Sequence, residues 1–174
     1  MVLSVTQKDG FFKVKQGYLV FFNDRVIFAV VNQKRQQQEI QLLREKLKAE
    51  GKGFFKGTAE IMRFWSNYGN KYYQMPAQSV LNDDPENIEM YYPGISLFHF
   101  VSARTQNNVD NTNSESYGKI IIHMGGNKIK FNHRYHDYNK KIKGILTGIF
   151  ANRLKYRGQI GIHINIGGNK DGFN

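Results

Sequence analysis

Stretches rich in β-branched and aromatic residues alternate with short polar breaks along the first third of the chain. Residues 17–31 form two such runs around Asn23-Asp24, and Asn and Asp suit a turn because they tolerate left-handed φ angles. Residues 3–6 and 11–15 have the same character and predict one or two further strands. The pattern therefore predicts that the chain begins with a series of strands joined by turns.

The spacing of apolar residues changes to a helical period after Asn32. Asn32 is a good helix cap and predicts a helix that runs through Gln36 to about Glu50. Gly51-Lys52-Gly53 ends this helix. A second helix is predicted over residues 55–68, and one of its faces is apolar: Phe54, Ile61, Trp65 and Tyr68.

The next segment returns to β-type patterning. After a short helix at residues 77–81, Pro93-Gly94 and Gly125-Gly126 supply turns. The polar residues 107–116 predict a mobile loop. Four strands are predicted around these turns: residues 87–92 and 95–103, which Pro93-Gly94 joins, and residues 117–124 and 127–132, which form a hairpin.

The last strong pattern is an amphipathic helix from about Asp137 to Tyr156. Burial of four or five large side chains would contribute roughly 1.5–3 kcal/mol each. Truncation of Ile142, Ile145 or Ile149 is therefore expected to be severe. The apolar stripe of this helix is wide: Tyr138, Ile142, Ile145, Leu146 and Ile149.

Three segments carry a resemblance to a known family. Gly17-x-Leu19 leads into the Asn23-Asp24-Arg25 turn, and a Met-containing turn at residues 70–81 precedes a short helix and the strand that follows it. Gly118-Lys-Ile-Ile-Ile122 begins the last hairpin before the final helix. These segments resemble the pleckstrin-homology-like fold in its bacterial branch and its GRAM-type relatives.

The resemblance implies an α+β fold. It implies a bent antiparallel β-sandwich or barrel, capped by a C-terminal amphipathic helix and carrying an inserted helical pair. We expect a single domain over residues 1–157 with the insertion at about 33–70. Residues 158–174 would form a tail that adds an edge strand.

Charge narrows the range of partners. The 174 residues include 25 Lys and Arg against 14 Asp and Glu, a net charge of +11. Residues 119–157 alone carry ten basic side chains against one acidic side chain. A basic field favours anionic partners such as nucleic acid, an acidic membrane surface or an acidic protein.

The basic residues that could bind an anion come from two parts of the chain. The first group lies in the early strands, whose loop is where the resemblance implies a lipid headgroup site. The second group lies in the last hairpin and at the start of the final helix. Together the candidates are Lys13, Lys15, Arg25, Lys128, Lys130, Arg134, Lys140, Lys141 and Lys143.

The second inserted helix combines aromatic residues with a basic flank, which is the composition of a helix at a membrane interface. Packing on the parent domain would explain the same pattern. Packing on a second subunit would explain it too and would give a homo-oligomer through the inserted helices. The candidate membrane or partner contacts are Phe54, Phe55, Phe64 and Trp65.

Signals for catalysis are weak. The chain contains no Cys, which excludes disulfides, thiolate zinc sites and Cys nucleophiles. His133-x-x-His136 lacks the further ligands that a metal needs. We therefore expect no catalytic residues, no metal and no cofactor.

The pattern favours a non-catalytic binding module that docks at an anionic membrane surface or on a protein partner. Nucleic-acid binding through the basic surface is the second hypothesis, and an enzyme is the third. Residues 1–8 lack an apolar core and no run approaches 18 apolar residues, so we expect a cytoplasmic protein, peripheral at the inner face of the membrane if it binds lipid.

Overall fold

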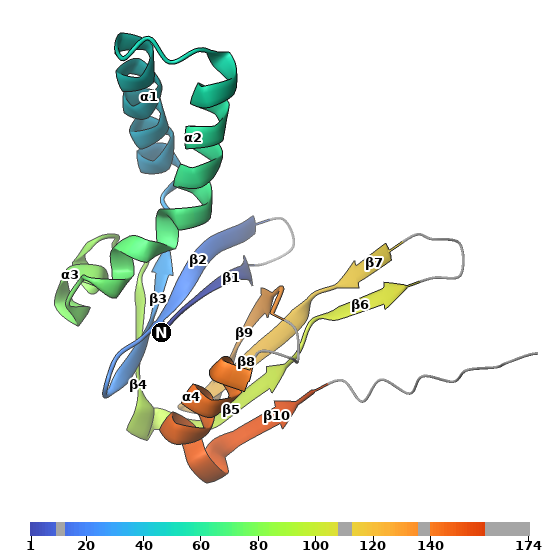
Figure 1. Cartoon of the computed structure of the whole chain (residues 1–174). Helices are drawn as coiled ribbons and strands as arrows, with labels where there is room; N and C mark the ends of the chain where they lie inside the picture. Colours follow the sequence, from blue (N-terminus) through green and yellow to red (C-terminus); the bar gives the residue numbers. More distant parts are fainter. Residues whose placement is uncertain (10–12, 108–112, 136–139, 159–174) are drawn as a thin grey trace, which may run out of the picture.

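A computed structural model describes residues 1–9, 13–107, 113–135 and 140–158. The fold is α+β: one open sheet of eight strands in the order β10-β5-β8-β9-β1-β2-β3-β4, a separate two-stranded ribbon, and four α-helices (Figure 1). The predicted α+β class is confirmed. The predicted tail strand at residues 158–174 lies almost wholly outside the described residues.

The first part of the sheet is an antiparallel meander of β1 (Val2–Asp9), β2 (Lys13–Phe21), β3 (Arg25–Val30) and β4 (Ile88–Tyr91). The turn at Asn23-Asp24 falls where the sequence predicts it. We expected one or two further strands at residues 3–6 and 11–15, and the structure has one, β1, because residues 13–15 begin the same strand as residues 17–21. The continuous strand needs Gly at position 17 because β3 lies so close to it: a Cβ on Gly17 would be 2.5 Å from the carbonyl oxygen of Ala29.

The helical insertion separates β3 from β4. It consists of α1 (Gln33–Ala49), α2 (Phe54–Asn67), the 3-10 turn η1 (Tyr68–Tyr73) and α3 (Ala77–Asn82). The side chain of Asn32 accepts a hydrogen bond from the Arg35 backbone N–H at 3.1 Å, so the predicted cap is confirmed. Figure 1 shows the α1–α2 hairpin projecting from the sheet, whereas η1 and α3 pack on β2 and β3.

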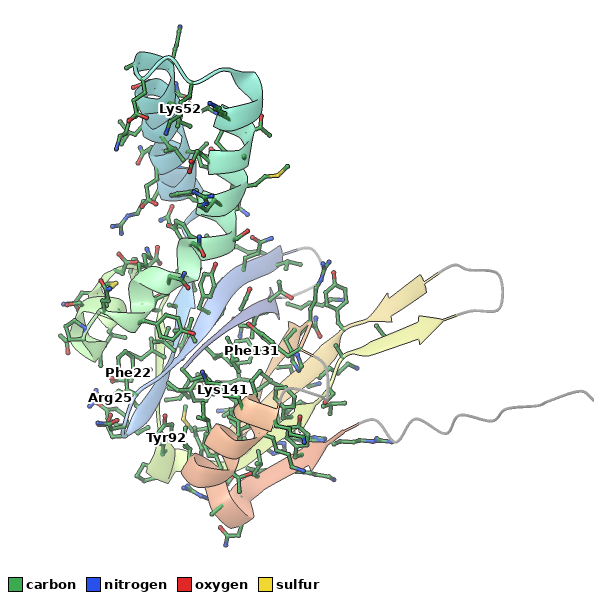
Figure 2. The ribbon with its side chains drawn as sticks, in the orientation of Figure 1. Phe22, Arg25, Lys52, Tyr92, Phe131 and Lys141 are labelled. Carbon is green, nitrogen blue, oxygen red and sulfur yellow. The ribbon has the colours of Figure 1, made fainter. Side chains whose placement is uncertain are left out.

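A three-residue 3-10 turn, η2 (Tyr92–Gly94), joins β4 to β5 (Ile95–Val101). These two strands lie at distant positions in the strand order, so the sheet must curl strongly for so short a connection to span them. The Tyr92 hydroxyl donates to the Phe22 carbonyl at 2.7 Å, and Arg153 donates to the Tyr92 carbonyl at 2.6 Å. Figure 2 labels Tyr92 and Phe22. These bonds fix the corner between the two parts of the sheet.

The second part of the sheet is formed by β5, β8 (Gly118–Met124) and β9 (Asn127–His133). Gly125 and Gly126 have φ angles of 56° and 78°, as a tight β8–β9 hairpin requires. Among the described residues, β9 pairs with β1 at two positions, Thr6 with Asn132 and Gln7 with Phe131. This short seam is where the two meanders meet.

The main core lies on the concave side of the sheet, beneath α4 (Lys140–Phe150). Ile142, Leu146 and Phe150 are buried there, and the Phe150 ring stacks on Phe98 with centroids 4.4 Å apart. Ile145 and Ile149 are only half-buried, so the most severe truncations are expected at Leu146 and Phe150.

The end of the predicted final helix is wrong. α4 stops at Phe150, because Ala151 adopts a left-handed φ of 46° and the 3-10 turn η3 (Ala151–Arg153) follows. Residues 154–157 then form β10 (Leu154–Arg157), which pairs parallel to β5. The sheet is consequently mixed and unclosed, and not the purely antiparallel structure that the resemblance implies.

The expected loop at residues 107–116 is also corrected in part. β6 (Arg104–Asn107) and β7 (Asn113–Ser116) pair as an antiparallel ribbon that extends beyond the main sheet (Figure 1). Backbone pairing does not depend on apolar side chains, which explains why a polar sequence conceals these two strands.

Candidate anion-binding surface

The convex side of β10, β5, β8 and β9 carries a cluster of cations. Side chains alternate along each strand, and those that face the core are apolar. The residues between them point to the opposite side, away from α4. Five exposed basic residues lie there, and we call them the basic face: Lys119, Lys128, Lys130, Lys155 and Arg157.

The strand registers arrange these cations in rows. Lys155 lies opposite His99, which lies opposite Ile121, which lies opposite Lys130. Directly opposed residues share a face of the sheet, so this row spans three strand spacings, about 14 Å between its end Cα atoms.

A second row runs parallel to the first and contains Arg157, Val101, Lys119 and Asn132. A third row places Lys128 opposite His123. The cations of the basic face are therefore neighbours on one surface, although they come from three strands.

No carboxylate offsets the basic face among the residues that the structure describes. The four strands β10, β5, β8 and β9 contain no Asp or Glu. Burial lowers the pKa of His99 below its usual value, and the charges of Lys155 and Arg157 lower it further. His99 lies in the middle of this surface, and its lowered pKa reflects the nearby positive charges in addition to its burial.

Several cations of the first meander and its helical insertion are instead paired with carboxylates. Lys15 contacts Glu86 at 3.2 Å, and Arg25 forms ion pairs with both Asp24 and Glu89. Lys13, at the start of β2, is exposed. Arg25 begins β3 and lies near the opposite end of the β2–β3 hairpin from Lys13, so these predicted anion ligands do not converge.

The remaining predicted cations lie in two other places. Lys140, Lys141 and Lys143 are exposed on α4, on the other side of the sheet from the basic face (Figure 2 labels Lys141). Arg134 follows β9 and donates to the Tyr117 hydroxyl at 2.9 Å. Of the nine predicted residues, the structure brings only Lys128 and Lys130 together on the basic face.

Sequence reasoning missed the other three members of this surface, Lys119, Lys155 and Arg157. The signal was present in the alternation of Leu154-Lys155-Tyr156-Arg157, which has the period of a strand with one apolar face. This alternation directly follows a strong helical pattern, and the predicted helix runs on to Tyr156, so the strand is concealed in the sequence.

The predicted aromatic contacts lie on α2. Phe64 is half-buried, and its ring packs against Tyr68 with centroids 5.5 Å apart. Trp65 is 45% exposed, and Met62 on the same helix is 65% exposed. The side chains of Phe54 and Phe55 lie outside the described part of the chain.

Comparisons of the chain with protein-family models, with curated proteins and with solved structures gave no match. Among the helices of the described segments, none has the length and apolar character needed to cross a bilayer. The described residues also contain no group of three or more His, Cys, Asp or Glu side chains arranged to hold a metal ion.

Proposed function

We propose that the chain is a binding module of the pleckstrin-homology-like type that docks through its basic face on an anionic membrane surface. The order of elements supports the fold assignment: a four-strand meander, a three-strand meander, then an amphipathic helix on the concave side. The helical insertion between β3 and β4 and the added strand β10 would be elaborations of that plan.

The observation that carries the proposal is the row arrangement of five cations with no carboxylate on the four strands. Each basic side chain near an anionic leaflet contributes about 1 kcal/mol. Five such side chains give about 5 kcal/mol, which corresponds to reversible rather than permanent attachment.

The side chains between the cations favour a lipid surface over a nucleic-acid strand. The uncharged positions within the rows are Leu97, Val101, Ile121 and Asn132, together with the imidazoles of His99 and His123. Proteins that bind single strands usually stack bases on exposed Phe, Tyr or Trp, and none lies in these rows. Point-charge attraction to clustered phosphates is what this surface provides.

Co-sedimentation with vesicles tests the proposal. We expect binding to vesicles of phosphatidylcholine that contain phosphatidylserine, no binding to phosphatidylcholine alone, and loss of binding as the salt concentration rises. The variant Lys128→Gln/Lys130→Gln should bind roughly 25-fold more weakly, because two contributions of about 1 kcal/mol are removed.

The matched control is Lys34→Gln/Lys46→Gln, which removes the same charge from exposed positions on α1. It should retain most of the binding. Equal binding to neutral and anionic vesicles, or equal losses in the two variants, would contradict the proposal. A gel shift of oligonucleotides that is lost specifically in Lys128→Gln/Lys130→Gln, without vesicle binding, would assign the surface to nucleic acid instead.

A further inference from the structure

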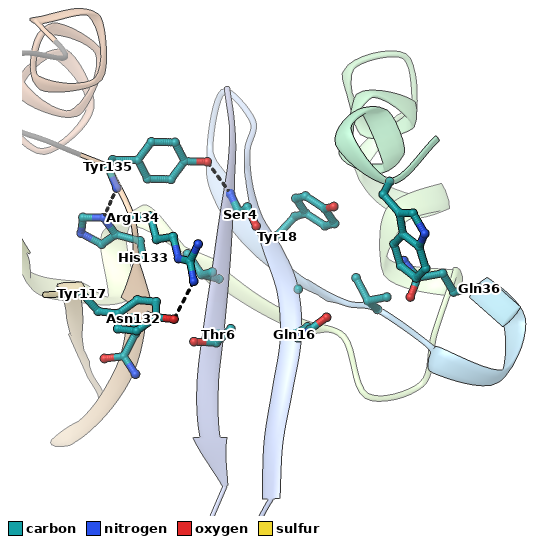
Figure 3. A pocket seen from close by; sticks show the side chains of 14 residues that line it. Ser4, Thr6, Gln16, Tyr18, Gln36, Tyr117, Asn132, His133, Arg134 and Tyr135 are labelled. Carbon is teal, nitrogen blue, oxygen red and sulfur yellow. Dashed lines mark hydrogen bonds between the residues drawn. The ribbon is translucent and has the colours of Figure 1, made fainter. Parts of the chain in front are cut away.

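A separate pocket of about 530 Å³ lies on the outer side of β1 and β2 (Figure 3). Its floor is formed by side chains that alternate with the core residues of these strands: Ser4 and Thr6 on β1, and Gln16 and Tyr18 on β2. Its volume lies within the range of about 300–1,000 Å³ typical of small-molecule sites.

The two walls of the pocket come from distant parts of the chain. Gln36 of α1 and Trp65 of α2 form one wall, so the helical insertion contributes directly. Arg134, Tyr117 and Asn132 border the opposite side, as Figure 3 shows. The described residues that line the pocket include no Asp or Glu.

Contacts around the pocket hold these walls in place. The Tyr135 hydroxyl accepts a hydrogen bond from the Ser4 backbone N–H at 2.7 Å, which ties the segment after β9 to β1. The Arg134 guanidinium lies 5.1 Å from the centroid of the Tyr117 ring, to whose hydroxyl it also donates. The site is therefore largely formed before any ligand binds.

The Tyr18 ring on the floor is similarly fixed. It packs against Tyr72 with centroids 5.6 Å apart. Gly69 lies so close that a Cβ on it would be 2.5 Å from the Tyr18 ring.

Gln36 brings a side-chain amide to the wall that the helical insertion forms. The residue is only 7% exposed, so packing holds its position on α1. The amide offers both a donor and an acceptor to a molecule in the pocket.

The chemistry of the two walls indicates the class of ligand. A side-chain amide can bond in two directions to the edge of a nucleobase, and an indole ring provides a stacking surface for its face. A guanidinium binds phosphate with two parallel hydrogen bonds. We propose that this pocket binds a mononucleotide, with its base near Gln36 and Trp65 and its phosphate near Arg134.

Trp65 is the only tryptophan of the chain, so its fluorescence reports on this pocket. Titration of the full chain with AMP, GMP, CMP and UMP, followed by fluorescence and by calorimetry, should give saturable binding of at least one of them with a Kd below about 1 mM. The controls are the nucleoside that corresponds to the bound nucleotide (adenosine for AMP), ribose 5-phosphate, inorganic phosphate and glucose. Each should bind at least about tenfold more weakly, because each lacks one part of the contacts.

Substitutions at the two walls sharpen the test. Gln36→Leu should weaken binding about tenfold and Arg134→Gln about tenfold or more, in line with neutral and charged hydrogen bonds. Gln37→Leu and Lys46→Gln, at exposed positions of α1, are the matched controls and should change little. Arg134 is exposed, so its variant remains informative even if Gln36→Leu fails to fold, which circular dichroism would reveal.

Several results would overturn the proposal: no mononucleotide binds below about 1 mM, phosphate or glucose binds as tightly as the nucleotides, or binding is unchanged in Arg134→Gln. The inference does not depend on the proposed membrane function. The variant Lys128→Gln/Lys130→Gln should bind nucleotides normally, so failure of one proposal leaves the other testable.

Discussion

The two meanders of the sheet belong to one strand order but differ in how their charged side chains are arranged. Residues 1–94 contain thirteen Lys and Arg against ten Asp and Glu, and several of these form ion pairs between elements. Residues 95–157 contain eleven Lys and Arg against three Asp and Glu, and the side chains of those three lie outside the described part of the chain.

The ion pairs of the first region have a structural task. Asp83, at the end of α3, receives Arg35 from α1 and Lys71 from η1, so one carboxylate links three parts of the helical insertion. The described residues of the basic face form no such links: along its rows the cations lie opposite His, Val, Ile and Asn residues and not opposite carboxylates. Ion pairs therefore tie the elements of the first region together, whereas the basic face presents its charges to solvent.

The largest effect should come from removing the support beneath the basic face. Phe150 is fully buried, and Phe150→Ala should lower the free energy of unfolding by about 3–5 kcal/mol, because it leaves a cavity between α4 and the sheet. Urea denaturation followed by circular dichroism measures this. Ile149→Ala, at a half-buried neighbour, should cost clearly less; equal losses would mean that α4 does not close the core as described.

The second prediction tests whether β10 belongs to the same surface. Lys155→Gln/Arg157→Gln should weaken binding to anionic vesicles roughly 25-fold, like the double substitution on β9, since about 1 kcal/mol is lost for each charge. Vesicle co-sedimentation is the measurement. Unchanged binding in this variant, with weak binding in the β9 variant, would confine the docking surface to β9.

A third pair of variants should separate the two regions by the direction of the effect on stability. Lys71→Gln removes the contact with Asp83 at 3.1 Å and the approach to the Tyr68 ring at 4.7 Å, and should cost about 1 kcal/mol. Lys130→Gln should cost nothing or stabilise slightly, because it relieves repulsion. Equal losses in thermal or urea denaturation would show that charge is used alike in both regions.

The smallest effect concerns the titration of His99, measured by NMR. Its pKa should lie below 6.5, chiefly through burial and then through Lys155, and Lys155→Gln should raise it. Because the folded pKa is below the unfolded value, the unfolded chain binds more protons between the two values, and stability falls as the pH drops through that window. A pKa at or above 6.5 would contradict an electropositive environment.

Much of the fold was predictable because strong local signals agree with it. The cap at Asn32, the turn at Asn23-Asp24 and the Gly125-Gly126 hairpin depend on local chemistry, and each is confirmed. The end of α4 was not predictable, because it depends on a left-handed Ala151 and on the space beside β5, which only the tertiary structure provides.

The candidate site was only half predictable for the same reason. Lys128 and Lys130 could be found from their position in a hairpin, whereas joining them to Lys155 requires the strand register across β8 and β5. The burial of Gln36 beside the pocket had no signal in the sequence at all, since a Gln in the first turns of a polar helix usually faces water.

The seam between β1 and β9 is the shortest pairing between neighbouring strands of the main sheet. Among the described strands, two residue pairs alone join the meanders by backbone pairing. Amide hydrogen exchange should therefore be faster at Thr6, Gln7, Phe131 and Asn132 than in the middle of either meander, because breaking so few bonds exposes them without global unfolding. The opening stays local, because side chains of both meanders share one core: the ring of Phe28 on β3 packs against that of Phe131 on β9 with centroids 4.9 Å apart.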